Sequence, residues 1–359
     1  MGKQILVPLD GTMLAHMALP HAATLARATT NRLLLLHVIP PLPADMLSWE
    51  VTQAAAFYHQ QQRKLSLMHH YLEATAEDLR DEGLLVHTEM IEGEPASAIV
   101  SRAEKDHLVE AIVMSTHSRR AMDSQFVGSV TEKVMYASPV HMLVVNPDEK
   151  MGSLRRFYRR SYRTILVLLD GSANAERALA SAQSLATTDG GVDGVVARTN
   201  LLLLAVVSRP IVEQAAGVLI EPMNTMNTPW AEDDHTSGAV EAEQMRHYLS
   251  ETAKLLIADG FSVGKQVLLG DPAGEIVRYA SQANADLIVM PLKPSFGHRH
   301  ARSSFDRMWG DSVATKVIRG AGLPVLFART AASRTGRGET PEQPDESLSA
   351  ILREEELVV

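Results

Sequence analysis

Short apolar runs of strand length alternate along the first half of the chain with longer segments whose apolar residues recur at helical spacing. The apolar runs predict buried strands at residues 5–9, 33–39, 84–91, 111–114 and 142–145. The helical spacing predicts helices over residues 14–26, 54–82, 96–105 and 129–135. Strands that are apolar on both faces and alternate with helices are typical of a parallel sheet covered on each side.

This pattern occurs twice. Residues 4–26 and 164–186 are identical at 12 of 23 positions with a constant offset of 160. A second block, residues 93–114, is similar to residues 270–290, and SVTEKV (129–134) is repeated as SVATKV (312–317). Three blocks in the same order indicate a duplicated domain. A solenoid is excluded, because its repeats would be far shorter.

The repeats define the expected domain organisation. Domain 1 is predicted at 1–147, a basic connector at 148–163 and domain 2 at 163–330. The remainder, 331–359, is an acidic tail rich in Gly, Pro and Ser, which we expect to be disordered. Each domain is predicted to be a Rossmann-like α/β/α fold with a five-stranded, mostly parallel sheet. The stretch 208–240 is too long for a simple connection and is interpreted as a lid, a docking segment or a mobile loop.

Composition narrows the function classes. The chain has 34 Lys and Arg against 43 Asp and Glu, a net charge of −9. We therefore expect no nucleic-acid partner, since binding to phosphate backbones depends on positive charge. The absence of cysteine excludes disulfides, thiolate metal sites and cysteine nucleophiles. No apolar run is long enough to span a bilayer, and Asp10 ends the first run too early for a signal peptide, so a cytoplasmic protein without a membrane partner is expected.

Two motifs recur at matching places in the repeats. The first strand of each repeat ends in Asp-Gly, at Asp10-Gly11 and Asp170-Gly171, and a Gly-Glu-Pro or Gly-Asp-Pro turn follows the third strand. A Gly-Ser pair, Gly128-Ser129, precedes the last helix of domain 1. The arrangement resembles the universal stress protein family, in a tandem form, and the resemblance extends over both repeats.

The resemblance implies a nucleotide site in domain 1. Family members that bind ATP carry Gly-x-x-Gly, nine residues and then Gly-Ser or Gly-Thr after the fourth strand. This chain keeps that spacing from Ser115 through Ser118 to Gly128-Ser129, with serine in place of both leading glycines. Such loops hold phosphate through backbone N–H groups at a helix N-terminus, where glycine permits a close approach.

The resemblance therefore implies ATP or a related nucleotide as the ligand of domain 1. The residues at matching positions are Pro8, Leu9, Asp10, Val38, Met114, Ser115, Ser118, Gly128, Ser129 and Val130. The alternative is that Gly128-Ser129 is only a helix N-terminal turn with Ser129 as its cap.

Domain 2 departs from the family pattern. Asp311 stands where domain 1 has Gly128, and a carboxylate there repels phosphate. Pro291 and Pro294 remove backbone donors from the same loop. We expect no ATP in domain 2, and we interpret the His- and Arg-rich residues 295–310 as an exposed basic loop.

The motifs that mark common enzymes are missing. The chain has neither a P-loop nor a Gly-x-Ser-x-Gly nucleophile elbow. His69 and His70 are adjacent, which is the wrong spacing for a metal pair on a helix, and His37 is interpreted as a hydrogen-bonded core histidine. The resemblance implies a stress-response binding protein, and the missing motifs lead us to expect no catalytic residues and no metal. Two alternatives stay open, a structural or interaction protein of the same family and a slow nucleotide hydrolase.

The last strand of each domain bears on assembly. The resemblance implies pairing through the fifth strands, here 142–145 and Val325–Ala328. An apolar edge strand invites association, and joining two copies in one chain raises their effective concentration. We expect the two domains to pair with each other, with a further homodimer left open.

Overall fold

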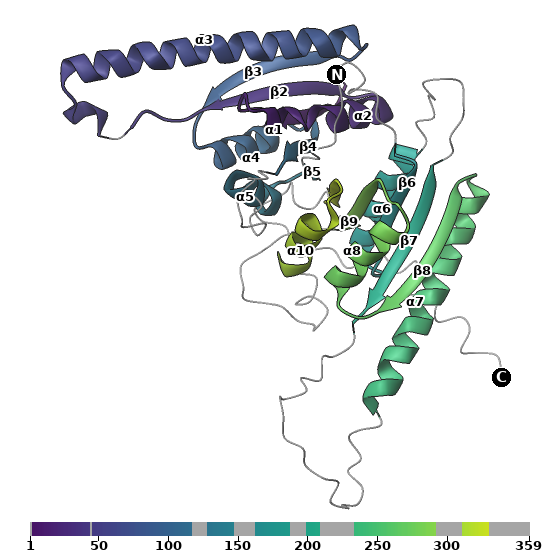
Figure 1. Cartoon of the computed structure of the whole chain (residues 1–359). Helices are drawn as coiled ribbons and strands as arrows, with labels where there is room; N and C mark the ends of the chain where they lie inside the picture. Colours follow the sequence, from purple (N-terminus) through teal and green to yellow (C-terminus); the bar gives the residue numbers. More distant parts are fainter. Residues whose placement is uncertain are drawn as a thin grey trace, which may run out of the picture.

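The computed structural model describes residues 2–43, 45–116, 128–146, 162–186, 199–208, 233–291 and 311–329. Domain 1 contains the strands β1 (Gln4–Pro8), β2 (Arg32–Ile39), β3 (Val86–Glu92), β4 (Val109–Ser115) and β5 (His141–Val145). Domain 2 contains β6 (Thr164–Leu168), β7 (Asn200–Val207), β8 (Ser262–Leu269), β9 (Leu287–Pro291) and β10 (Val325–Ala328). Together they form one sheet in the order β3-β2-β1-β4-β5-β10-β9-β6-β7-β8 (Figure 1).

Each half of this sheet is a parallel five-stranded unit. Neighbouring strands pair in parallel throughout β1–β5 and throughout β6–β10. The registers repeat as well, because Ile5 lies opposite Leu33 in domain 1 and Ile165 lies opposite Leu201 in domain 2. The fold predicted from the alternating pattern, two Rossmann-like domains with five-stranded parallel sheets, is confirmed.

Helices cover both faces of the sheet. One face carries α1 (Met13–His16), α2 (Leu19–Thr29), α3 (Val51–Asp81), α6 (Ala173–Ala186) and α7 (Asp233–Ala258). The other face carries α4 (Pro95–Lys105), α5 (Ser129–Ala137), α8 (Pro272–Gln282) and α10 (Asp311–Ala321). Successive residues of β1 accordingly enter different cores, Ile5 with the first set of helices and Leu6 with the second. This two-sided burial is the reason that the strands read as continuous apolar runs.

The single helix predicted over residues 14–26 is wrong in one respect. The segment forms two helices, α1 ending at His16 and α2 beginning at Leu19. Pro20 has no amide hydrogen to donate to the carbonyl of His16, so a continuous helix would lose that bond. Within the first turn of α2 the same proline is tolerated, because the amides there lack intrahelical partners.

The two domains meet where β5 and β10 pair antiparallel, with Leu326 opposite Leu143 and Phe327 opposite Met142. We call this strand pair, together with the helices packed across it, the seam. On one face α2 packs against α6. There the ring Nδ1 of His21 lies 2.7 Å from the hydroxyl of Tyr162, and both side chains are buried.

Several predicted features lie wholly or mainly outside the described residues. These are the basic connector, the acidic tail, the basic loop at 295–310, and residues 209–232 of the long stretch between β7 and α7. The end of that stretch, from Asp233, already belongs to α7. Among the described helices, none combines the length and the apolar character that a bilayer crossing requires.

Candidate functional site

The turn after β1 is organised by Asp10. Its Oδ1 accepts hydrogen bonds from the backbone N–H of Thr12 at 2.9 Å and from the Thr12 hydroxyl at 2.6 Å. Gly11 lies between them with a φ of 80°, a conformation that favours glycine. In domain 2, Asp170 accepts from the N–H of Ser172 at 3.0 Å. Both aspartates therefore shape the turn that ends the first strand.

The end of β2 lies beside this turn. Val38 is buried, and the N–H of Leu9 donates to the carbonyl of Leu36 at 2.8 Å. The ring Nδ1 of His37 lies 2.8 Å from the carbonyl oxygen of Leu9, so this nitrogen carries the proton and donates. The hydrogen bond expected of His37 is present and joins the ends of β1 and β2, but the side chain is only half-buried, so the interpretation of His37 as a core residue is wrong.

A hydroxyl ties the end of β4 to the start of α5. Met114 and Ser115 end the strand and are both buried. The carbonyl of Ser115 accepts a hydrogen bond from the Thr131 hydroxyl at 3.0 Å, and Thr131 is only 1% exposed. The first turn of α5 is thereby held against β4, the strand that precedes the loop from Ser115 to Gly128, which we call the candidate loop. Sequence reasoning missed Thr131, because a threonine on the buried face of a helix gives no signal of its own.

Helix α5 begins without a side-chain cap. Gly128 occupies the cap position with an extended backbone, and it has no side chain to accept from the amides of the first turn. Ser129 is the first helical residue and is exposed, so the alternative that makes Ser129 the cap is wrong. The amides of Ser129 and Val130 lie at the positive end of the helix dipole, where anions are stabilised.

These pieces share one edge of the sheet. β1 is flanked by β2 and β4, and the carboxyl ends of parallel strands lie on the same side. The strand order reverses at β1, which is the place where such sheets bind ligands. Of the predicted site residues, Ser118 lies outside the described part of the chain. The others come together at this edge: Pro8, Leu9, Asp10, Val38, Met114, Ser115, Gly128, Ser129 and Val130.

Domain 2 lacks the link between strand and helix. Ala314 takes the place of Thr131 in the repeated block, and Pro291 ends β9 where Ser115 ends β4. Because alanine has no hydroxyl, the bond from the helix to the strand carbonyl cannot form. Domain 2 therefore departs from the family pattern in two places: in the loop itself, and in the contact between strand and helix that holds the ends of the loop in domain 1.

We expect Thr131→Val to lower the free energy of unfolding by about 1–2 kcal/mol, because a buried carbonyl loses its hydrogen-bond donor while the side-chain volume is kept. Urea unfolding followed by circular dichroism measures the change. Thr131→Ser is the matched control, since it keeps the hydroxyl. Equal losses in the two variants would mean that packing, and not the hydrogen bond, makes Thr131 important.

A polar pair that the sequence pattern did not reveal lies beside the Asp10 turn. The ring Nδ1 of His16 is 3.1 Å from the hydroxyl of Tyr71, at a surface cavity of about 780 Å³ that Gly11 and Thr12 also line. Burial raises the pKa of Tyr71 to about 12, and the charge of Asp10 adds to the effect. Periodicity predicted a helix over this part of the chain, but it could not indicate that Tyr71 meets a histidine of α1.

The pair predicts a pH dependence of stability. Burial lowers the pKa of His16, and the charge of Asp78 opposes this shift only in part. The folded state thus prefers neutral imidazole, and the unfolded chain binds the proton more readily. The stabilising contribution is present above about pH 6.5 and is lost as the pH falls through the lower folded-state pKa. His16→Asn should flatten stability between pH 7 and pH 5, whereas the exposed His59→Asn should keep the wild-type slope.

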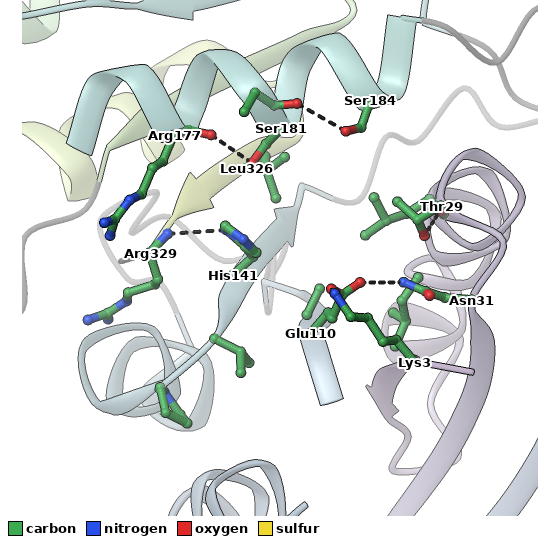
Figure 2. A pocket seen from close by; sticks show the side chains of 16 residues that line it. Lys3, Thr29, Asn31, Glu110, His141, Arg177, Ser181, Ser184, Leu326 and Arg329 are labelled. Carbon is green, nitrogen blue, oxygen red and sulfur yellow. Dashed lines mark hydrogen bonds and ion pairs between the residues drawn. The ribbon is translucent and has the colours of Figure 1, made fainter. Parts of the chain in front are cut away.

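A second cavity, of about 530 Å³, lies at the seam (Figure 2). Its domain 1 wall holds Lys3, Asn31 and Glu110. Lys3 donates to the Glu110 carboxylate, and the Asn31 amide donates to it at 2.8 Å. Burial tends to raise the pKa of Glu110, but these two hydrogen bonds, together with the charges of Lys3 and His141, leave the pKa below its ordinary value. This cavity lies at the amino ends of β1 and β4, opposite the expected ligand edge, and its lysine is already neutralised.

Comparison with known proteins agrees with this architecture. Residues 1–146 and 161–329 each match the sequence model of the Universal stress protein family. Universal stress protein MJ0531 of Methanocaldococcus jannaschii is 29% identical over 153 residues, which cover 41% of this chain and 84% of that protein. Universal stress protein MJ0577 of the same organism is 30% identical over 155 residues, covering 40% of this chain and 95% of that protein.

A solved structure spans both halves. The crystal structure of a universal stress protein from Archaeoglobus fulgidus DSM 4304 has a TM-score of 0.59 and 18% identity, over 91% of this chain and 96% of that chain. At this identity the likeness shows the fold. The family match covers most of the chain and occurs once in each half. The protein therefore belongs to the Universal stress protein family, with two such domains in tandem.

Proposed function

We propose that this protein binds ATP or a related nucleotide in domain 1, and that domain 2 is a degenerate copy without a nucleotide. One observation carries the proposal: α5 starts at Gly128 without a side-chain cap, at the same sheet edge as Asp10 and Val38. An uncapped helix N-terminus stabilises negative charge, and glycine lets a phosphate approach the backbone. The family spacing between Ser115 and Gly128 points to the same ligand.

The residues divide into two groups in this proposal. The amides of Gly128, Ser129 and Val130 take the phosphates, with Ser118 contributing from the loop. Asp10 and Val38 line the adenine end. The floor of the site is formed by residues at the strand ends: the buried Leu9, Met114 and Ser115, and the half-buried Pro8.

Family membership supports a role in the stress response. We propose a cytoplasmic protein that senses a nucleotide, with domain 1 at 1–147, a connector at 148–163, domain 2 at 163–330 and an acidic tail at 331–359. The two domains act as a pair through their last strands. The proposal also allows two whole chains to form a homodimer through other surfaces.

Calorimetry with ATP on the full-length protein tests the proposal, together with mass spectrometry of small molecules released from freshly purified protein. We expect one ATP per chain or one co-purified nucleotide. Two molecules per chain would show that domain 2 is functional. The proposal would be overturned if calorimetry detected no heat of ATP binding and mass spectrometry detected no released nucleotide.

A second candidate is an interaction protein of the same family that binds no nucleotide. The substitution of serine for both leading glycines of the loop, at Ser115 and Ser118, favours it, because a Cβ atom hinders the close approach of phosphate. Catalysis is not proposed. No group of three or more His, Cys, Asp or Glu in the described residues could hold a metal ion.

A further inference from the structure

The residue that follows the last strand of each domain reaches across the seam. Asn146 follows β5, and its Nδ2 donates to the carbonyl of Ile318 in α10 at 2.6 Å. Arg329 follows β10, and its guanidinium donates to the carbonyl of Met135 in α5. Met135 and Ile318 are equivalent positions of the repeat. Each domain therefore binds the C-terminal half of the other domain's last helix.

We call these two contacts across the seam, Asn146 on α10 and Arg329 on α5, clamps. The two clamps differ in charge. Arg329 is 5% exposed, and it also donates to the carbonyl of Tyr136 at 3.1 Å. Within the described residues no carboxylate pairs with it, and its Nε has no hydrogen-bond partner. Burial lowers the pKa of Arg329 to about 10, so the side chain keeps its charge at neutral pH. The groups that stabilise this charge are carbonyls at the C-terminal end of α5, the negative end of the helix dipole.

The backbone of Arg329 is also held in place. Its N–H donates to the ring Nδ1 of His141 at 3.2 Å, and Figure 2 shows the side chain leading away from this contact and from Lys3 and Glu110. The tyrosine that follows Met135 adds a second contact to the same helix end, because the hydroxyl of Tyr136 lies 2.9 Å from that of Thr315 in α10. The C-terminal end of α5 is thus fixed by domain 2.

The other end of α5 is the candidate nucleotide site. The helix has only nine residues, so its first turn at Gly128 and its clamped end move as one rigid element. The start of the candidate loop is held as well, because the hydroxyl of Thr116 donates to the Oδ1 of Asn146 at 2.9 Å. The same amide group of Asn146 reaches α10. Both ends of the loop in domain 1 are therefore connected to domain 2.

We propose that Arg329 is a positioning residue, through which domain 2 holds the nucleotide-binding end of α5 and couples nucleotide binding in domain 1 to the pairing of the domains. The second domain then has a function that needs no ligand of its own. This inference rests on the proposed nucleotide site for its binding part, while the clamp itself is independent of any ligand.

The test uses the full-length protein and Arg329→Met, with Arg278→Met as the matched control. Arg278 is an arginine of α8 in domain 2 whose guanidinium pairs with Glu275 of the same helix. Hydrogen exchange over residues 129–137 reports on the clamp, and we expect exchange in the last turn of α5 to rise about tenfold, since a charged hydrogen bond is lost. ATP calorimetry should show about fivefold weaker binding. Arg329→Lys should restore part of the exchange protection in α5 and part of the ATP affinity, because lysine keeps the positive charge.

Coupling is reciprocal, so ATP should also slow exchange in β10, the strand that leads to Arg329, in the wild type and not in Arg329→Met. A residue that only stabilised the fold would leave this response in place. Unchanged exchange in α5 overturns the proposal, and so does faster exchange with unaltered ATP affinity. If the wild type binds no ATP, the proposed nucleotide function fails. The exchange data then test by themselves whether Arg329 holds the C-terminal end of α5. Should Arg329→Met not fold, Thr315→Val removes a contact to the same helix end.

Discussion

Gly128→Asp is expected to weaken ATP binding at least about a hundredfold while leaving the fold intact. The carboxylate would stand at the start of α5, where the phosphates are proposed to bind, and would repel them at close range. It would also accept from the amides of the first turn, which have no partner within the helix, and compete for the donors that the ligand needs. The variant reproduces in domain 1 the residue that domain 2 carries at Asp311.

The same substitution should stabilise the protein by about 0.5–1 kcal/mol, because aspartate is a favourable cap and carries negative charge at the positive helix end. Calorimetry and urea unfolding of one preparation therefore give changes in opposite directions. Gly128→Ala is the matched control, since it adds a Cβ atom without a charge, and it should lose less affinity. Wild-type affinity in Gly128→Asp would show that the ligand does not use this helix end.

Phe327→Ala is expected to lower the free energy of unfolding by about 3–5 kcal/mol, the cost of a large cavity in a packed core. Phe327 is fully buried in β10, opposite Met142 of β5, and it belongs to a core that contains residues of both domains. The loss should therefore destabilise domain 1 as well as domain 2. Urea unfolding measures the total, and hydrogen exchange in β4 and β5 measures the share of domain 1.

Leu255→Ala serves as the matched control for this prediction. Leu255 lies in α7 with 71% of its surface exposed, so its truncation should cost less than about 0.5 kcal/mol. A change confined to domain 2 in Phe327→Ala would contradict the shared core. It would mean that the strands of the seam contribute little to holding the two domains together.

The outline of the fold could be predicted because its signals are local. Two-sided burial makes each strand a continuous apolar run, as in residues 33–36, and an Asp-Gly turn stops the first strand of each half. The duplication follows from residue identity alone. The break between α1 and α2 was missed, although Pro20 marks it, because the apolar spacing continues across the break without a change of phase.

The candidate site was predictable only in part, for the same reason. Spacing placed Gly128 at the start of a helix and Asp10 at the end of a strand, since both positions depend on neighbours in sequence. The hydroxyl of Thr131 on the carbonyl of Ser115 and the pairing of His16 with Tyr71 join residues that are far apart in the chain. Periodicity states which face of an element is buried, but not what it meets there.

The sequence by itself determined that this protein is two copies of one α/β domain, because hydrophobic period, turn chemistry and repetition are properties of short segments. Only the tertiary structure decided how the copies support each other. Arg329 and Asn146 show no pattern in the sequence, and they acquire a role because antiparallel pairing of β5 with β10 carries each strand end to the other domain's last helix. Contacts of this kind join residues that are far apart in the sequence and come within hydrogen-bond distance only when the chain folds.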